Sequence, residues 1–408
     1  MDATRFSLAD FFLGFNDDPL QPDEAFTEWR EQTRWATTLF EPAMGHGPDA
    51  HTTLVGEDGE AHPVLNFASY NYLGLNKHPE VLAAAEQALR DYGTGSCGSP
   101  LLSGATDLHR RLEHKLAEFT GREAAMLFNS GFGVALGVLA GLLRKGDVAL
   151  LDGRAHICLI DGVKLAGARP VLFDHDDPAD LDKRLKEHVG ARRVVLAEGI
   201  YSIHGDVAKL PELLDVCESN GVGMLVDEAH SVLTVGPTGR GAVELLGVSD
   251  RVGLYYATFS KAFASIGSFV AGDKEVIDYL RWYANSYAFS AALPASVVAG
   301  IDAALDVATR DDSLRNQLAE NAACFRDGLH ALGIDTGPST THVVPMMVGK
   351  GRRRLYEVGN KLREQGLFVS PFDYPSVPDD GLCFRACVSA AHTREDLDAA
   401  LQIVKACW

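Results

Sequence analysis

Lys261 has the surroundings of a chemically reactive lysine. It lies between two apolar runs, Leu254–Ala257 and Phe269–Ala271, and most of the residues from 262 to 268 are small. Both runs are predicted to be buried strands. Burial disfavours the charged form of a lysine, and the neutral amine is a nucleophile that forms Schiff bases with carbonyl compounds. Because most lysines in such a local sequence are solvated charges, the assignment depends on the rest of the chain.

Asp227 is a second candidate for chemistry. It follows the apolar residues Met224–Val226, which predict a buried strand. A protonated pyridine nitrogen is one suitable partner for this carboxylate, and the protonated ring is the electron sink of pyridoxal phosphate. His230, three residues later, could bond the ring oxygen of that cofactor. The alternatives are an aspartate that caps the next helix and a histidine with a structural role.

Polar residues also follow two other predicted strands. His156 comes after the strand Val148–Leu151, where its imidazole could stack on the cofactor ring. Glu198 and Ser202 come after a further strand that ends at Ala197. Because parallel strands place their carboxyl ends at one edge of the sheet, we expect these side chains to lie near one another.

A phosphate site is predicted where another strand meets the start of a helix. Ser130, Gly131 and Phe132 occupy this junction. Free backbone N–H groups at a helix N-terminus favour an anion, and glycine permits its close approach. Thr258 and Ser260, just before the candidate lysine, can add hydroxyl donors.

The order of the predicted elements indicates an α/β fold. Between residues 124 and 261, apolar strands alternate with helices, which is typical of a mostly parallel sheet covered on both faces. A long helical region then reaches about Leu332, and a smaller α+β part follows. We expect an N-terminal segment at residues 1–62, a large domain at 63–300 and a small domain at 301–408.

The elements outside the alternating region are predicted from apolar periodicity. Helices are expected at Glu24–Phe40, Pro79–Tyr92, Asp107–Thr120, Leu355–Gln365 and Glu395–Lys405, and strands at Val64–Ala68, Val343–Val348, Leu367–Ser370 and Phe384–Ser389. The polar, glycine-containing stretch His46–His62 is assigned neither helix nor strand. The glycines at 93, 95 and 98 have the spacing of a dinucleotide-binding motif, but they follow a helix rather than a strand, so we expect only a loop.

Composition and charge exclude several classes of protein. The chain has 408 residues and a formal net charge of -19, which argues against nucleic acid or an anionic membrane as the main partner. Its seven cysteines show neither a disulfide framework nor zinc spacing, so we expect reduced thiols, no metal and a cytoplasmic location. The first fifteen residues do not read as a signal peptide, and no apolar stretch is long enough for a membrane span.

Taken together, these motifs resemble the α-oxoamine synthase family of fold-type I pyridoxal phosphate enzymes. The similarity runs from about Asn66 to Lys405. It rests, in this order, on the segments NFASYNYLGL, FNSGFG, DGRAHICLIDG, EGIYSIHGD, VDEAHSVLTVGPTGRG, TFSKAFASIGSFVAG, FSAALPA and RACVSAAHTREDLDAAL. The resemblance implies a large domain with a mostly parallel seven-stranded sheet and a smaller α+β C-terminal domain.

The resemblance also implies roles for the candidate residues. Lys261 would form the Schiff base with pyridoxal 5'-phosphate, and Asp227 would pair with the pyridinium nitrogen. His156 would stack on the ring, with His230 and Ser202 on the side of the ring oxygen. The remaining cofactor contacts implied are Ser130, Gly131, Phe132, Thr258 and Ser260.

Two further residues match positions near the substrate in this family. Arg385 corresponds to an arginine that receives the substrate carboxylate, and Asn71 lies in a turn close to the substrate. The family forms homodimers, and the segment FSAALPA reaches the cofactor phosphate of the partner subunit. Here that segment has alanines at 291 and 292 where many relatives carry a hydroxyl, so Ser290 is the remaining hydroxyl.

The predicted reaction is the decarboxylative condensation of an α-amino acid with an acyl thioester to give an α-amino ketone. The thioester would be carried by coenzyme A or by an acyl carrier protein. An aminotransferase or a lyase on the same fold is the alternative among enzymes, because both would use Lys261 and Asp227. A catalytically silent subunit is the alternative outside enzymes, and it would be expected to lack the lysine.

Overall fold

The computed structural model describes residues 6–7, 10, 18, 20–21, 23–56 and 59–408. Most of the N-terminal stretch that does not read as a signal peptide therefore lies outside the described residues. The chain forms two compact units. One contains residues 71–202 and 206–316, and the other contains the residues up to Tyr70, the short stretch 203–205 and the residues from 317 onward. The domain limits expected from the sequence, including the one at residue 300, stay predictions.

The first of these units is built on a seven-stranded sheet, which lies wholly within the described residues. Its order is β4-β10-β9-β8-β7-β5-β6. Only β10 runs antiparallel to its neighbours β4 and β9, and the other strand pairs are parallel. The bounds are β4 Ala124–Phe128, β5 Val148–Asp152, β6 Arg169–Phe173, β7 Arg193–Glu198, β8 Gly223–Asp227, β9 Leu254–Thr258 and β10 Ser268–Gly272. This architecture confirms the predicted α/β fold with a mostly parallel seven-stranded sheet.

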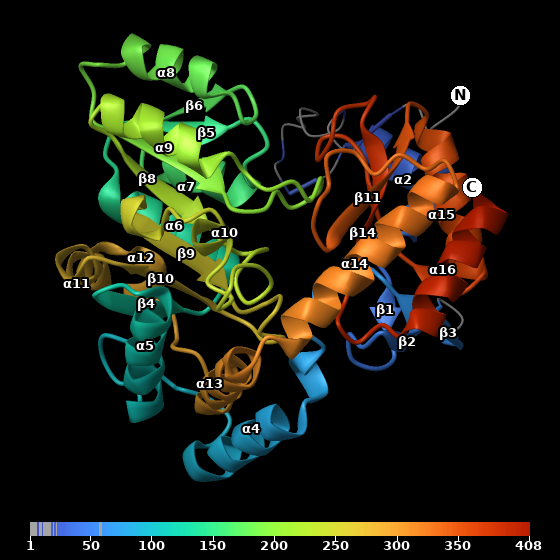
Figure 1. Ribbon diagram of the computed structural model, residues 1–408, viewed down its shortest axis with the longest axis horizontal. Helices are drawn as coiled ribbons and strands as arrows, with labels where there is room; N and C mark the ends of the chain where they lie inside the picture. The colour runs from blue at the N-terminus through green and yellow to red at the C-terminus, as the bar shows by residue number, and fades with distance from the viewer. Residues whose placement is uncertain (1–5, 8–9, 11–17, 19, 22, 57–58) are drawn as a thin grey trace. The chain divides into compact units, whose positions relative to one another are not determined.

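Helices cover the sheet in two layers (Figure 1). The helices α6 and α7 pack against each other and against β4, β5, β6 and β10, whereas α8 and α9 pack together and contact β5, β6 and β8. Their bounds are α6 Gly131–Leu142, α7 Ile157–Leu165, α8 Pro178–Glu187 and α9 Leu210–Ser219. Successive side chains of a strand point to opposite faces, so a sheet between two layers of helices has apolar residues on both faces. All five residues of β5 are buried for this reason.

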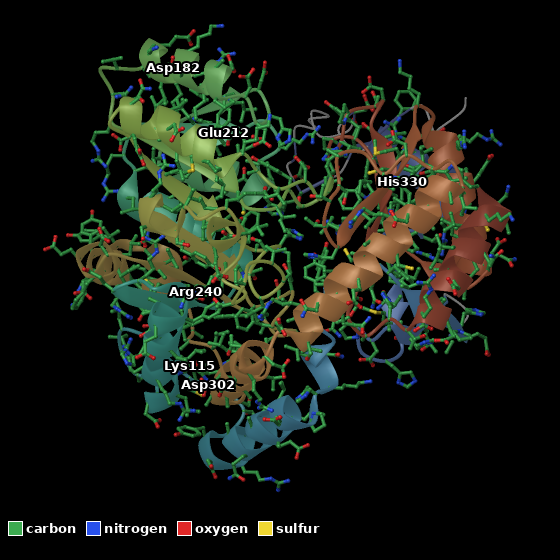
Figure 2. All side chains as sticks on the ribbon, viewed as in Figure 1. Lys115, Asp182, Glu212, Arg240, Asp302 and His330 are labelled. Carbon is green, nitrogen blue, oxygen red and sulfur yellow. The ribbon has the colours of Figure 1, made fainter. Side chains whose placement is uncertain are left out.

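Further helices complete this unit. They are α4 Pro79–Tyr92, α5 Asp107–Thr120, α10 Ala242–Leu245, α11 Lys274–Tyr283, α12 Asn285–Ala288 and α13 Ala295–Arg310. The helices α4 and α5 begin and end where the sequence predicted. Lys115 of α5 lies next to Asp302 of α13, with 2.8 Å between Nζ and Oδ1 (Figure 2). This ion pair links two helices that also pack against each other.

The second unit contains two small sheets and their helices. One sheet has the order β1-β2-β3-β12 and the other β11-β14-β13. The strands are β1 Ala43–Met44, β2 His51–Val55, β3 Ala61–Asn66, β11 Val343–Gly349, β12 Leu367–Phe368, β13 Ser370–Phe372 and β14 Leu382–Cys387, and the helices are α2 Glu24–Gln32, α3 Arg34–Thr37, α15 Arg352–Glu364 and α16 Arg394–Cys407. The helix α14, Ser313–Ala331, begins at the end of the first unit and continues into this one.

The strands β1 and β2 of this unit were not predicted from the sequence. The stretch His46–His62 was assigned no regular structure, yet it contains β2. This strand pairs antiparallel with β3, with His51 opposite Leu65 at one end and Val55 opposite Ala61 at the other. Only Thr52 and Leu54 of β2 are buried. A short strand with only two buried side chains shows little apolar periodicity in the sequence. The segment is a strand because it pairs with β3.

The seven cysteines all lie in the described part of the chain, as thiols. Within that part, no helix has both the length and the apolar character needed to cross a membrane.

Gly205 provides a test of the packing in the second unit. Its φ is 69°, and a Cβ atom there would lie 1.9 Å from the carbonyl oxygen of Val343. Gly333, with φ 75° and no atom near a Cβ, is the matched control. Gly333→Ala should cost only the left-handed backbone strain of about 1–2 kcal/mol. Gly205→Ala should cost about 1–3 kcal/mol more, because the Val343 backbone must move.

Thermal unfolding of both variants, followed by circular dichroism, measures this difference. Equal losses of stability in the two variants would contradict the close approach of Val343 to Gly205.

Candidate active site

Lys261 lies in the loop that joins β9 to β10, between two buried strands as predicted. The residue is half-buried rather than enclosed. Its carbonyl oxygen accepts a hydrogen bond from the Ala264 N–H at 2.8 Å, and the Ser265 N–H donates to Phe259 at 2.9 Å. Ala264 has a φ of 53°, which is uncommon for a residue other than glycine. The loop therefore holds Lys261 in a tight and locally strained turn.

Asp227 ends β8 and is buried beside two other charged groups. Burial raises its pKa to about 6, against the lowering effects of Lys261 and of a hydrogen bond from the Ala229 N–H. Glu198 is the partner of Asp227 in the register between β7 and β8. Burial and the negative Asp227 raise the pKa of Glu198 well above its ordinary value. Two carboxyl groups and one lysine thus share a site of low dielectric, where a positive group next to Asp227 is favoured.

A local hydrogen bond tests the alternative that Asp227 serves only to cap the segment that follows it. The Ala229 N–H donates to Asp227 Oδ1 at 2.9 Å, so this carboxylate closes a local turn. A carboxylate has two oxygens and about four lone pairs, and one such bond leaves capacity for another donor. The local turn and a cofactor contact are therefore compatible.

His230 and Asn71 come from loops on this same unit. The Tyr72 hydroxyl and His230 Nδ1 are 2.8 Å apart, and both side chains are buried. Asn71 Nδ2 donates to Asn76 Oδ1 at 2.6 Å. The turn that contains Asn71 is therefore fixed on two sides, by its own amide and by the bond from Tyr72 to His230.

His156 lies at the N-cap of α7 and is exposed. Its ring Nδ1 accepts a hydrogen bond from the Cys158 backbone N–H at 3.2 Å. The backbone N–H of His156 donates to Glu198 Oε1 at 2.6 Å. Because Nδ1 acts as an acceptor, Nε2 carries the proton in the neutral ring. The backbone of His156 is held at the edge of the sheet, while its imidazole remains accessible.

The start of α6 forms a narrow cradle. Ser130 is the N-cap, and its hydroxyl accepts a bond from the Gly133 N–H at 2.9 Å. A Cβ atom on Gly131 would lie 2.9 Å from Thr258 Oγ1, so a larger residue would collide with β9. The Tyr256 hydroxyl donates to the Gly131 carbonyl at 2.8 Å and fixes this close approach. Phe132 follows and is exposed.

Three hydroxyl groups lie close to this cradle. Thr258 Oγ1 is 2.8 Å from Ser260 Oγ and donates to the Gly267 carbonyl at 2.9 Å, so these bonds stay within the loop of Lys261. The Ser268 hydroxyl donates to the Ser130 carbonyl at 2.8 Å and so links the end of this loop to the N-cap of α6.

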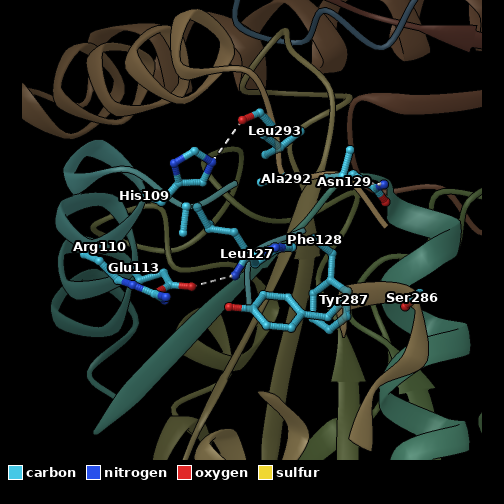
Figure 3. A pocket seen from close by; sticks show the side chains of 13 residues that line it. His109, Arg110, Glu113, Leu127, Phe128, Asn129, Ser286, Tyr287, Ala292 and Leu293 are labelled. Carbon is cyan, nitrogen blue, oxygen red and sulfur yellow. Dashed lines mark hydrogen bonds and ion pairs between the residues drawn. The ribbon is translucent and has the colours of Figure 1, made fainter. Parts of the chain in front are cut away.

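Ser290 lies in the segment FSAALPA, which approaches the same helix start within one chain. Asn129 Nδ2 donates a short hydrogen bond to Ser290 Oγ. The His109 Nε2 atom is 2.9 Å from the Leu293 carbonyl oxygen, and Glu113 accepts a bond from the Leu127 N–H, as Figure 3 shows.

The loop with the dinucleotide-like glycine spacing holds this segment as well. The Ala292 N–H donates to the Gly98 carbonyl at 2.9 Å, and the Ser96 hydroxyl donates to the Ala292 carbonyl at 2.7 Å. This loop follows α4 and begins no helix, in agreement with the rejection of a dinucleotide site.

Arg385 and Ser202 complete the set of predicted residues. Ser202 is half-buried in the loop after β7. Arg385 belongs to β14 of the other compact unit, where its guanidinium carbon lies 4.8 Å from the ring centre of Tyr70 and 4.5 Å from that of Phe372. Its Nη2 donates to the Tyr70 hydroxyl at 2.5 Å. Its place in the site remains a prediction.

The residues present in the first unit fit pyridoxal phosphate. The cradle at Gly131 excludes even a Cβ atom, and the N–H groups of the first turn of α6 suit an anion. Asp227 supplies a buried carboxylate for a cationic ring nitrogen, and Lys261 supplies an amine in the next loop. The chemistry of these donors matches the phosphate, the ring and the aldehyde of the cofactor.

Several residues that build this site were absent from the sequence-based selection. They are Tyr72, Asn129, Tyr256 and Ser268. Each acts through a hydrogen bond to a residue distant in sequence, such as the bond from Tyr256 to Gly131. Tyr72, Asn129 and Ser268 lie within the motifs quoted above, but nothing in the order of the chain indicates the partner of any of the four residues.

Known proteins resemble the whole of this arrangement. A sequence model of the aminotransferase class I and II family matches residues 62–404. The 8-amino-7-oxononanoate synthase of Thermoanaerobacter pseudethanolicus is 38% identical over 341 residues, which cover 83% of this chain and 86% of that protein. The serine palmitoyltransferase of Caulobacter vibrioides is 39% identical over 345 residues, 84% of this chain and 85% of that protein.

Solved structures agree with this assignment. The serine palmitoyltransferase of Sphingomonas wittichii superposes with a TM-score of 0.90 at 30% identity, covering 96% of this chain and 98% of that one. A serine palmitoyltransferase from S. paucimobilis, solved with a bound aldimine of pyridoxal phosphate and myriocin, gives 0.89 at 29% identity and covers 94% and 96%. The chain therefore belongs to the aminotransferase class I and II family and is a pyridoxal-phosphate-dependent acyltransferase of the α-oxoamine synthase type.

Proposed function

We propose that this enzyme condenses an α-amino acid with an acyl thioester, with loss of carbon dioxide, to give an α-amino ketone. The observation that carries the proposal is the buried Asp227 beside Lys261 at the edge of the sheet, in a chain of the α-oxoamine synthase type. The names of the relatives make serine and a palmitoyl thioester the first substrates to test.

The candidate residues divide the work of holding the cofactor. The N-terminus of α6, with the hydroxyls of Thr258 and Ser260, would bind the phosphate, and Ser290 would contribute at its edge. His156 would face the ring, with His230 and Ser202 near its oxygen. When bound, pyridoxal phosphate supplies an electron sink for the bond that breaks at the α-carbon of the amino acid.

Two side chains control the protons. Asp227, when ionised, holds a proton on the ring nitrogen by charge and hydrogen bonding. Its pKa of about 6 keeps most of this carboxylate charged at pH 7. Lys261 would hold the cofactor through its aldehyde group, and its Nζ would accept the proton that leaves the substrate α-carbon.

Arg385 is the proposed partner of the substrate carboxylate, with Asn71 near the same substrate. Its guanidinium carbon lies 4.8 Å and 4.5 Å from the ring centres of Tyr70 and Phe372, and these contacts restrict the movement of the donor groups. A planar fork matches a carboxylate through two parallel hydrogen bonds. The rings would exclude water from this interaction and strengthen it.

Exposed side chains support a proposal for the assembly and for the acyl carrier. Trp282, Tyr283 and Phe289 are more than half exposed, which supports a homodimer whose interface includes the FSAALPA segment. The basic stretch KGRRR at 350–354 is largely neutralised, because Arg352 pairs with Asp373 and Asp379, and Arg353 pairs with Glu357. We therefore favour coenzyme A over an acidic carrier protein as the thiol of the substrate.

The direct test supplies amino acids and acyl thioesters together. Purified protein with pyridoxal phosphate is incubated with serine, alanine or glycine and acyl thioesters of coenzyme A or acyl carrier protein. Release of the free thiol and of carbon dioxide is then measured. We expect both products in equal amounts, and neither from Lys261→Ala. The family also contains aminotransferases, so transfer of the amino group to 2-oxoglutarate without thiol release would replace this proposal with that activity.

Asp227→Asn should retain the cofactor but lose most of the turnover. The amide keeps the shape of the side chain, yet it lacks the negative charge that holds the ring nitrogen protonated. We expect kcat to fall by about 10²–10³, the scale for removal of one electrostatic stabiliser. Steady-state kinetics beside cofactor absorbance measures both effects, and near-normal turnover would eliminate this role.

Arg385→Lys should weaken amino-acid binding far more than thioester binding. A lysine offers a point charge in place of the planar fork, so the amino-acid dissociation constant should rise about 10-fold or more. Tyr70→Phe, which keeps the ring and removes one hydrogen-bond partner, should have a smaller effect. The constants come from amino-acid-dependent absorbance changes, beside the KM of the thioester. An unchanged amino-acid constant in Arg385→Lys would make this residue structural.

A further inference from the structure

His175 lies between two carboxylates at the edge of the sheet where the active site is proposed. It follows β6, and its Nδ1 is 2.9 Å from Oδ1 of Asp152, the last residue of β5. Its Nε2 is 2.7 Å from Oδ2 of Asp206, which follows β7. A carboxylate oxygen only accepts hydrogen bonds, so both ring nitrogens must donate. A histidine with two N–H groups is an imidazolium cation.

The groups around His175 favour this charge. Asp152 is completely buried, and Asp206 nearly so. The backbone of Asp176 donates to Asp152 Oδ2 at 2.9 Å, while Arg154 Nη1 lies 3.6 Å from Asp206 Oδ1. The other neighbours are the ring of Tyr201, whose centre is 4.5 Å away and edge-on, and Lys209, which donates to the Asp176 carbonyl. Burial alone would lower the pKa of His175, but the bonds to Asp152 and Asp206 raise it to about 9.

A bound metal ion is a poor explanation of the cluster. The ligand atoms of Asp152, His175 and Asp176 do lie within 4.8 Å of one another. A histidine binds a metal through a nitrogen lone pair, and an imidazolium has none. Both His175 nitrogens already donate to carboxylates.

Asp152 and Asp206 each fix one loop of the proposed site. Asp152 Oδ1 also accepts the Arg154 N–H at 2.8 Å, which fixes the short loop that ends at His156. Asp206 closes the loop that contains Ser202, because its carbonyl accepts the Tyr201 N–H at 3.0 Å. His175 therefore connects the loop of His156 to the loop of Ser202, beside the ion pair of Arg154 with Asp206.

We propose that His175 is a positioning residue for the cofactor site: as a cation it joins Asp152 to Asp206 and so fixes the loops that carry His156 and Ser202. The inference rests on the proposed cofactor contacts of these two residues. His175 itself would touch neither cofactor nor substrate. Removing its charge leaves two buried carboxylates facing each other, and the loops should then move apart.

The charge gives this role a characteristic pH dependence. The pKa of His175 is raised in the folded state, so its stabilising interaction is fully present below the ordinary histidine pKa of about 6.5. It is lost as the pH rises through about 9. The contribution of His175 to cofactor binding should disappear over the same range.

The experiment compares full-length variants reconstituted with pyridoxal phosphate between pH 6 and pH 10. The cofactor dissociation constant is measured at each pH for the wild type, His175→Asn, Asp206→Asn and the control His114→Asn. His114 is an exposed histidine of α5 that faces one carboxylate, Glu118. The ratio of each variant to the wild type removes the pH dependence of the cofactor itself.

We expect His175→Asn to bind the cofactor about 10-fold more weakly at pH 7, the scale seen when a group that orients a binding histidine is removed. This ratio should fall towards one above pH 9, where the wild type also loses the charge. In Asp206→Asn, one of the two carboxylates that hold the proton is gone, so the loss of affinity should occur at a lower pH. His114→Asn should match the wild type throughout.

Two outcomes would overturn the inference. One is a dissociation constant for His175→Asn equal to that of the wild type at pH 7. The other is a ratio that stays constant from pH 6 to pH 10, which a merely structural residue would give. If circular dichroism shows that His175→Asn is unfolded, the test is the pH at which Asp206→Asn loses affinity for the cofactor. If that pH equals the wild-type value, the proposal is contradicted. Because the readout is cofactor binding, failure to form an amino ketone would count against the proposed function only.

Discussion

The burial of the Asp227 carboxylate is the constraint on which the site depends. An ionised carboxylate away from water is costly unless positive charge or hydrogen-bond donors lie next to it. Burial raises the pKa of Asp227 to about 6, whereas Lys261 and a hydrogen bond from the Ala229 N–H favour the charged form. This buried strand end therefore presents a carboxylate next to which a positive group is favoured.

The parallel sheet explains why this charge lies among so many other polar groups. The strands β5, β6, β7 and β8 run in the same direction, so the residues after each strand meet at one edge. The backbone groups there lie beyond the strand ladder and need other hydrogen-bond partners. The result is a set of bonds between loops, such as those from His156 to Glu198 and from His175 to Asp152 and Asp206. These bonds hold the loops after the separate strands next to one another at this edge.

Backbone conformation sets a second condition on the same surface. The start of α6 approaches β9 so closely that Gly131 has no room for a side chain. On the other side, Ala264 adopts a left-handed conformation in the loop of Lys261. Strain of this kind persists where the surrounding structure holds it, as the bonds from Thr258 and Ser268 do here. The start of α6 and Lys261 are therefore positioned by the same pair of strands, β9 and β10.

Local sequence alone determined the fold class and selected the candidate reactive groups. Strands alternating with helices require a mostly parallel sheet, and a polar residue after each buried run identifies the edge where ligands bind. This reasoning found Lys261, Asp227 and His156 because each follows an apolar run that is visible in the chain. The polar strand β2 lacked such a run and was missed, since its pairing with β3 creates it.

Only the tertiary structure decided which residues act on one another. Tyr256 reaches Gly131, Tyr72 reaches His230, and His175 joins Asp152 to Asp206, across separations of 23 to 158 residues in the sequence. The order of a chain states which residue types are present but not which donors face which acceptors. That choice depends on strand order and loop conformation, which arise from packing of the whole sheet. The chemistry could therefore be predicted from the sequence, whereas the contacts that hold it in place could not.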